Sequence, residues 1–384
     1  MIVEKLIPGG QALATLPDGK KLFLWNALPG ETVDDYRITK NKTHYAEAIA
    51  LSISHPSPHR VMPVDSCYLS TSPWQIMSEA YELEYKQAIV KELFREHQIL
   101  IETPAIFTDH QIYHYRNKME YSLYWDHDTG QIQLAFHLRG SHGKLPISQS
   151  SIERPEIFQA AMDIVGDLNL RHDEARRYQS LLLRTSGNGQ VSGGLYEKHQ
   201  PHPIFPPLTD TILGHPYSYS PNGFFQINLP VYELALKAMK PYITTGPVLD
   251  LYSGVGTIGL SIARDHELTL VECDHSAYQE LEANCRGVSR ATPVLAKSEA
   301  VPSFITPLST VILDPPRAGC HESLLERLLE VTPPTIIYLS CNPATQARDL
   351  RTLLTKYRLA TVQTFNFFPR TPHIENLVVL SRQN

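Results

Sequence analysis

The sequence YLSCNPAT places Cys341 directly after an apolar strand and just before Asn342 and Pro343, which can open a helix. A thiol at a helix N-terminus has a lowered pKa and a larger thiolate fraction, so Cys341 is a candidate nucleophile. The commoner fate of a cysteine is a small, inert, buried side chain. That interpretation suits the other four cysteines, which are Cys67, Cys273, Cys285 and Cys320.

Two further motifs put charged side chains at the ends of strands. VILDPPRAG ends a strand at Asp314, and its two prolines make a rigid turn that carries Arg317. FFPRTPHIENLVVL puts His373 and Glu375 just before the last strand, where a carboxylate can act as a general base. Taken alone, the first motif also fits a structural turn and the second a solvated loop.

A glycine-rich turn follows an apolar strand in VLDLYSGVGTIGLSIA. Gly254 and Gly256 let the backbone approach a ligand where the next helix starts. Glu272 ends the following strand, where an acidic side chain can accept hydrogen bonds from both ribose hydroxyls of a nucleoside. The pattern predicts a nucleoside-containing cofactor, although dinucleotide sites and plain tight turns look similar.

The four motifs end four strands, so a single crevice can gather a cofactor turn, a cysteine nucleophile and a base. This combination suits methylation of carbon 5 of uracil, which is not nucleophilic enough to take a methyl group from a sulfonium. A thiolate that adds at carbon 6 makes carbon 5 nucleophilic. After methyl transfer a base removes the carbon 5 proton and the thiolate leaves.

The elements that must position these motifs alternate as strand and helix from about residue 216 onward. Such alternation predicts a doubly wound, mostly parallel α/β sheet, here a Rossmann-like methyltransferase domain over residues 216–384. Residues 1–55 read as five short strands separated by turns, which suggests a small OB-like β-barrel. Residues 56–215 mix strands with helices and predict a central α+β domain.

Composition narrows the class of protein. The 384 residues are 42% hydrophobic and contain no run of about 18 apolar residues, so we expect no membrane span. The first residues show no secretory pattern, and five irregularly spaced cysteines favour a reducing cytoplasm. The net charge of −6 does not by itself indicate a nucleic-acid partner, because binding to RNA needs only a local basic surface.

At this point the chain resembles the RNA uracil-5-methyltransferase family over nearly its whole length. LIPGGQALATLPDGKKLFLWNALPGE resembles the family's N-terminal TRAM domain, an RNA-binding barrel, and YRNKMEYS resembles its central signature. SPNGFFQIN, DLYSGVG, the strand ending in Glu272, DPPRAG, SCNPAT and FPRTPHIE then follow in the family's order. The resemblance implies an S-adenosyl-L-methionine-dependent enzyme that forms 5-methyluridine in transfer or ribosomal RNA. We expect it to be a monomer in the cytoplasm.

The resemblance also implies roles for individual residues. It makes Cys341 the nucleophile, which forms a covalent adduct at carbon 6, and Glu375 the general base. It further implies cofactor contacts from four residues, which are Gln226, Tyr252, Glu272 and Asp314. Gly254 and Gly256 belong to the same cofactor turn.

One family feature is missing from the sequence. Many members carry an iron–sulfur cluster on four cysteines, but the aligned positions here are Pro63, Leu69, Ser72 and the pair Ser150–Ser151. Only Cys67 lies nearby, and one thiol cannot hold a cluster that needs four ligands. We therefore predict no iron–sulfur cluster and no other metal site.

Three alternatives remain at this stage. Methylation of an exocyclic amine needs no cysteine and favours an aromatic residue after the Pro-Pro pair, where this chain has Arg317. RNA cytosine-5 enzymes commonly place the nucleophile after proline, whereas Cys341 follows Ser340. A catalytically silent RNA-binding protein would need neither Cys341 nor Glu375.

Overall fold

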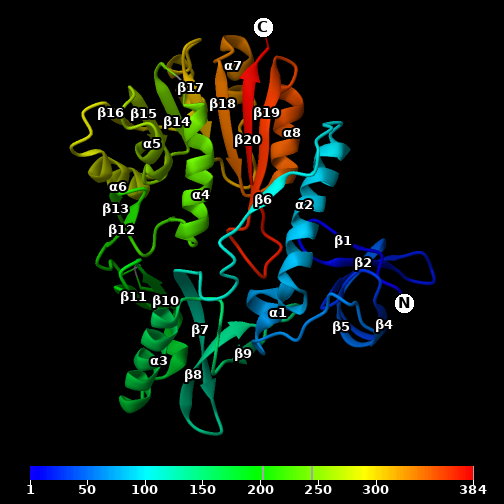
Figure 1. The fold of residues 1–384 in the computed structure, drawn as a ribbon. Helices are drawn as coiled ribbons and strands as arrows, with labels where there is room; N and C mark the ends of the chain where they lie inside the picture. Colours follow the sequence, from blue (N-terminus) through cyan, green and yellow to red (C-terminus); the bar gives the residue numbers. More distant parts are fainter. Residues whose placement is uncertain (201–202, 244, 384) are drawn as a thin grey trace.

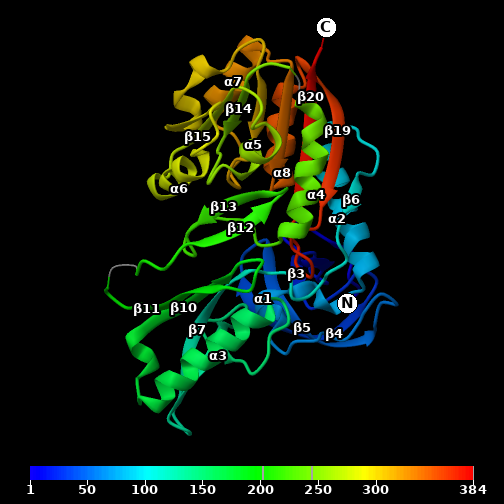
Figure 2. The same cartoon turned by 60° about the vertical axis from the view of Figure 1, so that its left-hand side comes forward.

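The computed structural model describes residues 1–200, 203–243 and 245–383. The described chain forms two lobes, with a large mixed sheet in one and a smaller antiparallel sheet in the other (Figure 1). The N-terminal strands lie beside the smaller lobe, and the hairpin of β12 (Leu208–Ile212) and β13 (His215–Tyr219) lies between the lobes (Figure 2).

The large sheet has eight strands in the order β16-β15-β14-β17-β18-β20-β19-β6. The five strands from β16 to β18 are parallel to one another, while β20 runs antiparallel to both of its neighbours. The bounds are β14 (Val248–Leu251), β15 (Leu268–Glu272), β16 (Ala291–Leu295), β17 (Thr310–Leu313), β18 (Thr335–Ser340), β19 (Tyr357–Phe365), β20 (Glu375–Arg382) and β6 (Ala105–Phe107).

Burial explains why these strands are continuous apolar runs. Along β18, Ile336 and Tyr338 belong to one hydrophobic cluster, while Ile337 and Leu339 belong to a second. A strand with both faces covered has no solvent side for polar residues. The connecting helices are α4 (Leu229–Met239), α5 (Thr257–Ile262), α6 (His275–Cys285), α7 (Glu322–Val331) and α8 (Pro343–Leu353). The predicted alternation of strand and helix is confirmed.

The N-terminal part forms a separate sheet in the order β1-β2-β3-β5-β4. Its strands are β1 (Lys5–Leu6), β2 (Ala12–Thr15), β3 (Lys21–Trp25), β4 (Thr32–Asn41) and β5 (Tyr45–His55). An additional bridge joins Ile2 to Thr32 at the start of β4. Five strands before residue 56 agree with the predicted number; that they form an OB-like barrel stays a prediction.

The middle segment has the mixed character expected for residues 56–215. Its antiparallel sheet has the order β11-β10-β7-β8-β9, and α3 (Pro155–Leu170) packs against it. The strands are β7 (Lys118–Asp126), β8 (Gln131–His137), β9 (Lys144–Pro146), β10 (Tyr178–Thr185) and β11 (Val191–Glu197). Short helices include α1 (Tyr68–Thr71) and the single 3-10 turn η1 (Pro73–Ile76).

Two elements of the middle segment extend to the large sheet. Helix α2 (Glu79–Glu96) packs beside α8, and β6 pairs with β19 at the edge of the sheet (Figure 1). The division of the chain into three domains stays a prediction, and these two elements link the second predicted domain to the third. Among the helices in the described ranges, none has both the length and the apolar character needed to cross a bilayer.

Candidate active site

The carboxyl ends of β14, β15, β17 and β18 meet at one edge of the sheet because these strands are parallel. Strand β20 runs the other way, so its first residue, Glu375, lies at the same edge. In the ladder between β18 and β20, Ser340 pairs with Asn376. Cys341 follows Ser340 and Glu375 precedes Asn376, so in this antiparallel ladder Cys341 and Glu375 are neighbours.

The turn that carries Arg317 is attached to the start of α8. Asn342 caps this helix by accepting a hydrogen bond from the backbone of Ala344 at 3.2 Å. Its amide donates to the carbonyl of Arg317 at 2.9 Å, and the hydroxyl of Thr345 donates to the same carbonyl at 3.1 Å. Helix capping thus holds the DPPRAG turn next to Cys341.

The thiol of Cys341 is half-buried. Burial, together with the nearby carboxyls of Glu375 and Asp314, raises its pKa to about 11, while Arg317 acts in the opposite direction. The direction is opposite to the one that a helix N-terminus alone predicts. In the unliganded protein the cysteine is therefore a thiol, and Arg317 is the group that favours its thiolate.

The carboxyls around Cys341 are also perturbed. Burial raises the pKa of Glu375 well above its usual range, with a further contribution from Asp314. Burial raises the pKa of Asp314 to about 7. His373 lies 3.1 Å from a guanidinium nitrogen of Arg317 through Nδ1, and burial together with this positive neighbour lowers its pKa to about 4. Such shifts are characteristic of sites that handle protons.

The predicted cofactor turn follows β14. Gly256 caps α5 with a left-handed φ of 89°, and a Cβ there would lie 2.6 Å from Leu281. Gly254 has a φ of 54° and open space where a Cβ would stand. The carboxylate of Glu272 accepts a hydrogen bond from the backbone of Gly254 at 2.8 Å, so the ends of β14 and β15 are joined.

Two buried polar atoms below this turn have no partner among the described residues. They are Oδ1 of Asp250 and the hydroxyl of Ser253. The other carboxyl oxygen of Asp250 accepts a hydrogen bond from Gly259 at 2.8 Å, and burial raises the pKa of Asp250 to about 8. Tyr252, between them in sequence, has a φ of 62° and packs against the hydrophobic core.

Gln226 lies in the SPNGFFQIN loop, and residues of the middle segment donate hydrogen bonds to the backbone of this loop. The amide of Asn117 donates to the carbonyl of Gln226 at 3.0 Å, and Lys118 donates to the carbonyls of Asn222 and Gly223 at 3.1 Å each. The buried guanidinium of Arg184 also donates to Gly223, at 3.1 Å. The YRNKMEYS motif therefore positions the loop of Gln226, and sequence reasoning missed Arg184, which lies in no motif.

Comparison with known proteins agrees with this geometry. Residues 303–383, which hold the DPPRAG, SCNPAT and FPRTPHIE motifs, match the sequence profile described as tRNA (Uracil-5-)-methyltransferase. An uncharacterized RNA methyltransferase of Thermosynechococcus vestitus is 28% identical and is covered over 97% of its length by 99% of this chain. One from Enterococcus faecalis is also 28% identical, with 95% of this chain and 93% of the relative covered. The chain is thus similar to RNA methyltransferases over nearly its whole length, and its C-terminal part is similar to tRNA (uracil-5-)-methyltransferases.

A solved structure extends the likeness over both lobes. The Pyrococcus abyssi tRNA (uracil-54, C5)-methyltransferase, solved in complex with S-adenosyl-L-homocysteine, superposes with a TM-score of 0.78. The alignment covers 99% of each chain at 21% sequence identity. This likeness confirms the class I methyltransferase fold predicted from the alternation of strands and helices.

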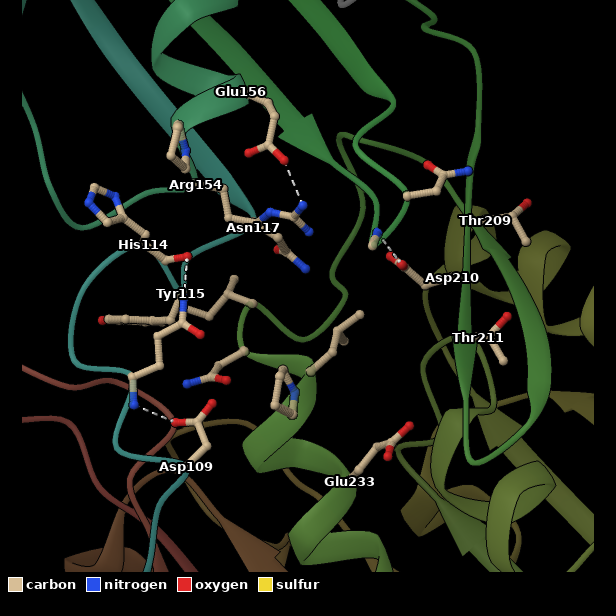
Figure 3. Close-up of a pocket in the computed structure, with 18 residues that line it drawn as sticks. Asp109, His114, Tyr115, Asn117, Arg154, Glu156, Thr209, Asp210, Thr211 and Glu233 are labelled. Atoms are coloured by element: carbon tan, nitrogen blue, oxygen red, sulfur yellow. Dashed lines mark hydrogen bonds and ion pairs between the residues drawn. The ribbon is translucent and has the colours of Figure 1, made fainter.

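A large cavity of about 1180 Å³ opens between the lobes, behind the loop of Gln226. Figure 3 shows Glu156 of α3 and Arg154, which precedes this helix, on one side, Thr209 of β12 on another and Glu233 of α4 below. Among the described residues, none of the predicted site residues lines this cavity. It is therefore separate from the predicted site at the carboxyl ends of the strands, which we call the strand-end site and which comprises the glycine turn after β14, Asp314, Cys341 and Glu375.

The region that aligns with the family's iron–sulfur ligands holds a hydrogen-bonded group that we call the Gln75 network, made of Asp65, Ser72, Gln75 and Ser151. Gln75 donates to Asp65 at 2.8 Å and to Ser72 at 2.7 Å, and the hydroxyl of Ser151 donates to Asp65 at 2.8 Å. Cys67 is buried nearby. In the part of the chain that the structure describes, no three His, Cys, Asp or Glu side chains are arranged to hold a metal.

Proposed function

We propose that this chain is an S-adenosyl-L-methionine-dependent RNA methyltransferase that forms 5-methyluridine in transfer or ribosomal RNA. The observation that carries the proposal is the adjacency of Cys341 and Glu375, which follows from the pairing of Ser340 with Asn376. Residues 1–55 are proposed as the RNA-binding TRAM domain, 56–215 as the central domain and 216–384 as the methyltransferase domain.

The residues around the glycine turn fit a bound S-adenosyl-L-methionine. Open space stands above Gly254, and the unpartnered oxygens of Asp250 and Ser253 can accept or donate hydrogen bonds to a polar ligand. Gln226, Tyr252, Glu272 and Asp314 are the further residues proposed to hold it, with Gly256 in the turn. When bound, this cofactor supplies an electrophilic methyl group on a sulfonium.

The protein's own residues carry the remaining chemistry. Cys341 loses its proton to water, which its half-exposed position permits, and the positive charge of Arg317 favours the thiolate. The sulfur then bonds to carbon 6 of uracil, and the electron pair of the ring double bond becomes available at carbon 5. After carbon 5 is methylated, Glu375 removes its proton, the double bond reforms and the bond between sulfur and carbon 6 breaks.

The raised pKa of Glu375 suits this last step. A carboxylate whose protonated form is stabilised by burial is a stronger base than an exposed one. The same residue must be ionised before it accepts the proton, so the step is favoured at higher pH. His373, with its lowered pKa, is the second candidate for the base.

The decisive experiment traps the bond between Cys341 and the RNA. With RNA carrying 5-fluorouridine at the target position, wild-type protein and cofactor should form an adduct that survives denaturing electrophoresis, because no base can remove fluorine. Glu375→Gln should accumulate the same adduct on ordinary RNA, while Cys341→Ala should form none on either. The matched control is Glu326→Gln, since Glu326 is an exposed glutamate on α7.

Two outcomes would count against the proposal in different ways. If wild-type protein turns over ordinary RNA yet leaves no stable adduct on the fluorinated RNA, the cysteine-addition mechanism is wrong. If Glu375→Gln turns over ordinary RNA at the wild-type rate, only the assignment of the base is wrong. His373→Ala is then the next variant to test.

A further inference from the structure

The loop between β19 and β20, residues 366–374, leads directly into Glu375 and carries His373. Most of its side chains are buried, although the loop lies at the end of the sheet. Arg370, in the middle of the loop, has a left-handed φ of 63°, which a non-glycine residue adopts only when its surroundings impose it. The residues that contact Arg370 lie mainly outside the methyltransferase sheet, in and near helix α2.

Helix α2 supplies a fully buried ion pair beneath this loop. Glu82 and Lys86 lie one helical turn apart, and Nζ of Lys86 is 2.9 Å from a carboxyl oxygen of Glu82. The same Nζ donates to the side chain of Asn366 at 2.6 Å and to the carbonyl of Phe368 at 3.1 Å. Lys86 therefore directs two hydrogen bonds into the first half of the loop.

Glu82 holds the middle of the loop. Its two carboxyl oxygens accept hydrogen bonds from the backbone N–H of Arg370 at 3.0 and 3.1 Å. The guanidinium of Arg370 lies 3.5 Å from the same carboxylate and donates to the carbonyl of Met77 at 2.6 Å. The backbone of Trp74 donates to the carbonyl of Arg370 at 3.0 Å, so η1 also contacts the loop.

These contacts join regions that are distant in the sequence. In Figure 1 the loop at the lower end of β20 lies beside α2, and the hydrogen bond from Trp74 adds η1; both elements precede the loop by almost 300 residues. Buried ion pairs contribute little to stability compared with well-packed apolar side chains of similar size, because both ions must be desolvated. What such a pair offers is a set of directed hydrogen bonds, and here they end on backbone atoms of the loop.

We propose that Glu82, Lys86 and Arg370 form a positioning cluster that fixes residues 366–374 and so aims Glu375 at the carbon 5 proton of the methylated uridine. This inference rests on the proposed function, since it assigns the cluster to the last chemical step. The three residues touch neither RNA nor cofactor in this scheme. They act through the backbone of the loop that ends at Glu375.

Lys86→Met tests the cluster, because it keeps most of the side-chain volume and removes both hydrogen bonds to the loop. Displacing a catalytic group by about 1 Å typically costs on the order of 100-fold in rate. We expect turnover on ordinary RNA to fall by about 10- to 100-fold, the KM for RNA to stay unchanged and covalent adduct to accumulate. The rate of adduct formation on 5-fluorouridine RNA should equal that of wild type, since that reaction does not use Glu375.

The matched control is Lys91→Met on the same helix. Lys91 is exposed and donates to Thr103 at 3.2 Å, away from the loop, so this variant should behave as wild type. A milder variant, Tyr115→Phe, removes one hydrogen bond from the same loop, the 2.9 Å bond to the carbonyl of Pro369. It should lower turnover in the same direction, by less, and it keeps the test available should Lys86→Met not fold.

The outcomes separate this inference from the proposed function. If wild type forms no adduct on fluorinated RNA, the proposed function fails before the cluster is tested. If wild type forms the adduct and the loop variants lose turnover and adduct formation in equal measure, the cluster has only a general structural role and the inference is wrong. Turnover at the wild-type rate in both Lys86→Met and Tyr115→Phe would also overturn it.

Discussion

The strand-end site and the Gln75 network both contain buried polar side chains, but they differ in how many of the buried polar atoms have hydrogen-bond partners. In the Gln75 network, both carboxyl oxygens of Asp65 and both the oxygen and the nitrogen of the Gln75 amide have partners within 3.1 Å. At the strand ends, Oδ1 of Asp250 and the hydroxyl of Ser253 are buried without partners. Natural proteins tolerate such unpaired groups mainly where function requires them.

The two regions also differ in how their carboxyl groups are surrounded. At the strand ends, the pKa values of Asp250, Asp314 and Glu375 are all raised, because burial disfavours their charged forms. In the Gln75 network, Asp65 instead accepts hydrogen bonds on both carboxyl oxygens. One region keeps groups ready to exchange protons, and the other region holds the chain together. Variants in the two should therefore separate chemistry from stability.

The largest expected effect comes from Cys341→Ala. We expect loss of methyl transfer by at least about 1000-fold, because Cys341 is the thiol that lies next to Glu375 and the uncatalysed carbon 5 is a poor nucleophile. Cofactor binding, measured by calorimetry, should stay within about twofold of wild type, because the thiol contributes to the barrier rather than to the cofactor turn. Residual activity above about a hundredth of wild type would remove Cys341 from the role of nucleophile.

The next effect concerns pH and Arg317. Arg317 lowers the pKa of Cys341 and of Glu375, and both groups must lose a proton to act. Arg317→Gln should therefore raise both pKa values and shift the rising limb of the pH profile to higher pH. The measurement is the rate of adduct formation on 5-fluorouridine RNA between pH 6 and 10, at saturating RNA.

In that experiment the variant should be severalfold slower than wild type at every pH measured, because the pKa of Cys341, about 11, lies above the whole range. Arg327→Gln is a suitable control, since Arg327 lies on α7 and pairs with Glu330 on the surface. A wild-type rate at saturating RNA, with only the KM for RNA raised, would mean that Arg317 binds RNA and does not influence the ionisation of the site.

The strand-end site was largely predictable from sequence because each part is local. An apolar run followed by a turn specifies a strand end, and parallel strands bring their ends together, so Cys341, Asp314 and Glu272 could be placed at one edge from their own motifs. The structure adds a correction at Cys341, whose pKa is raised because buried carboxyls outweigh the helix N-terminus. Those carboxyls come from two other strands, which the local pattern does not describe.

The supporting contacts were not predictable in this way. Residues 76–97 have mixed charge at helical spacing, which in sequence resembles a solvated amphipathic helix. Glu82 and Lys86 are nevertheless fully buried, because their partners Asn366 and Arg370 arrive from a loop almost 300 residues away. Arg184 likewise lies in no motif, and its contacts depend on the packing of the middle segment against the SPNGFFQIN loop.

Gln75→Ala should produce a stability effect without a chemical one. Removing this amide leaves the part-buried backbone N–H of Val64 and the buried one of Asp65 without their acceptor, and Ser72 without its donor. We expect a loss of about 3 kcal/mol in the free energy of unfolding, measured with urea. Adduct formation by the folded fraction should match wild type, and Gln159→Ala, an exposed site on α3, should change stability by less than about 0.5 kcal/mol. A chemical defect without a stability defect would contradict the division drawn between the two regions.

The smallest expected effect is the absence of any response to iron removal. Where family members place cluster ligands, this chain has Ser72, engaged by Gln75, and Ser151, engaged by Asp65, and these hydroxyls are poor ligands for iron–sulfur clusters. Cys67 is the one nearby thiol in the described residues, and burial raises its pKa to about 12, which disfavours the thiolate that metals bind. Protein purified without oxygen should therefore be colourless and contain substoichiometric iron, and exhaustive chelation should change neither its unfolding midpoint nor its methylation rate. A broad brown absorbance with several irons per chain would show instead that the Gln75 network rearranges around a cluster, and the contrast between a reactive and a purely structural polar region would fail.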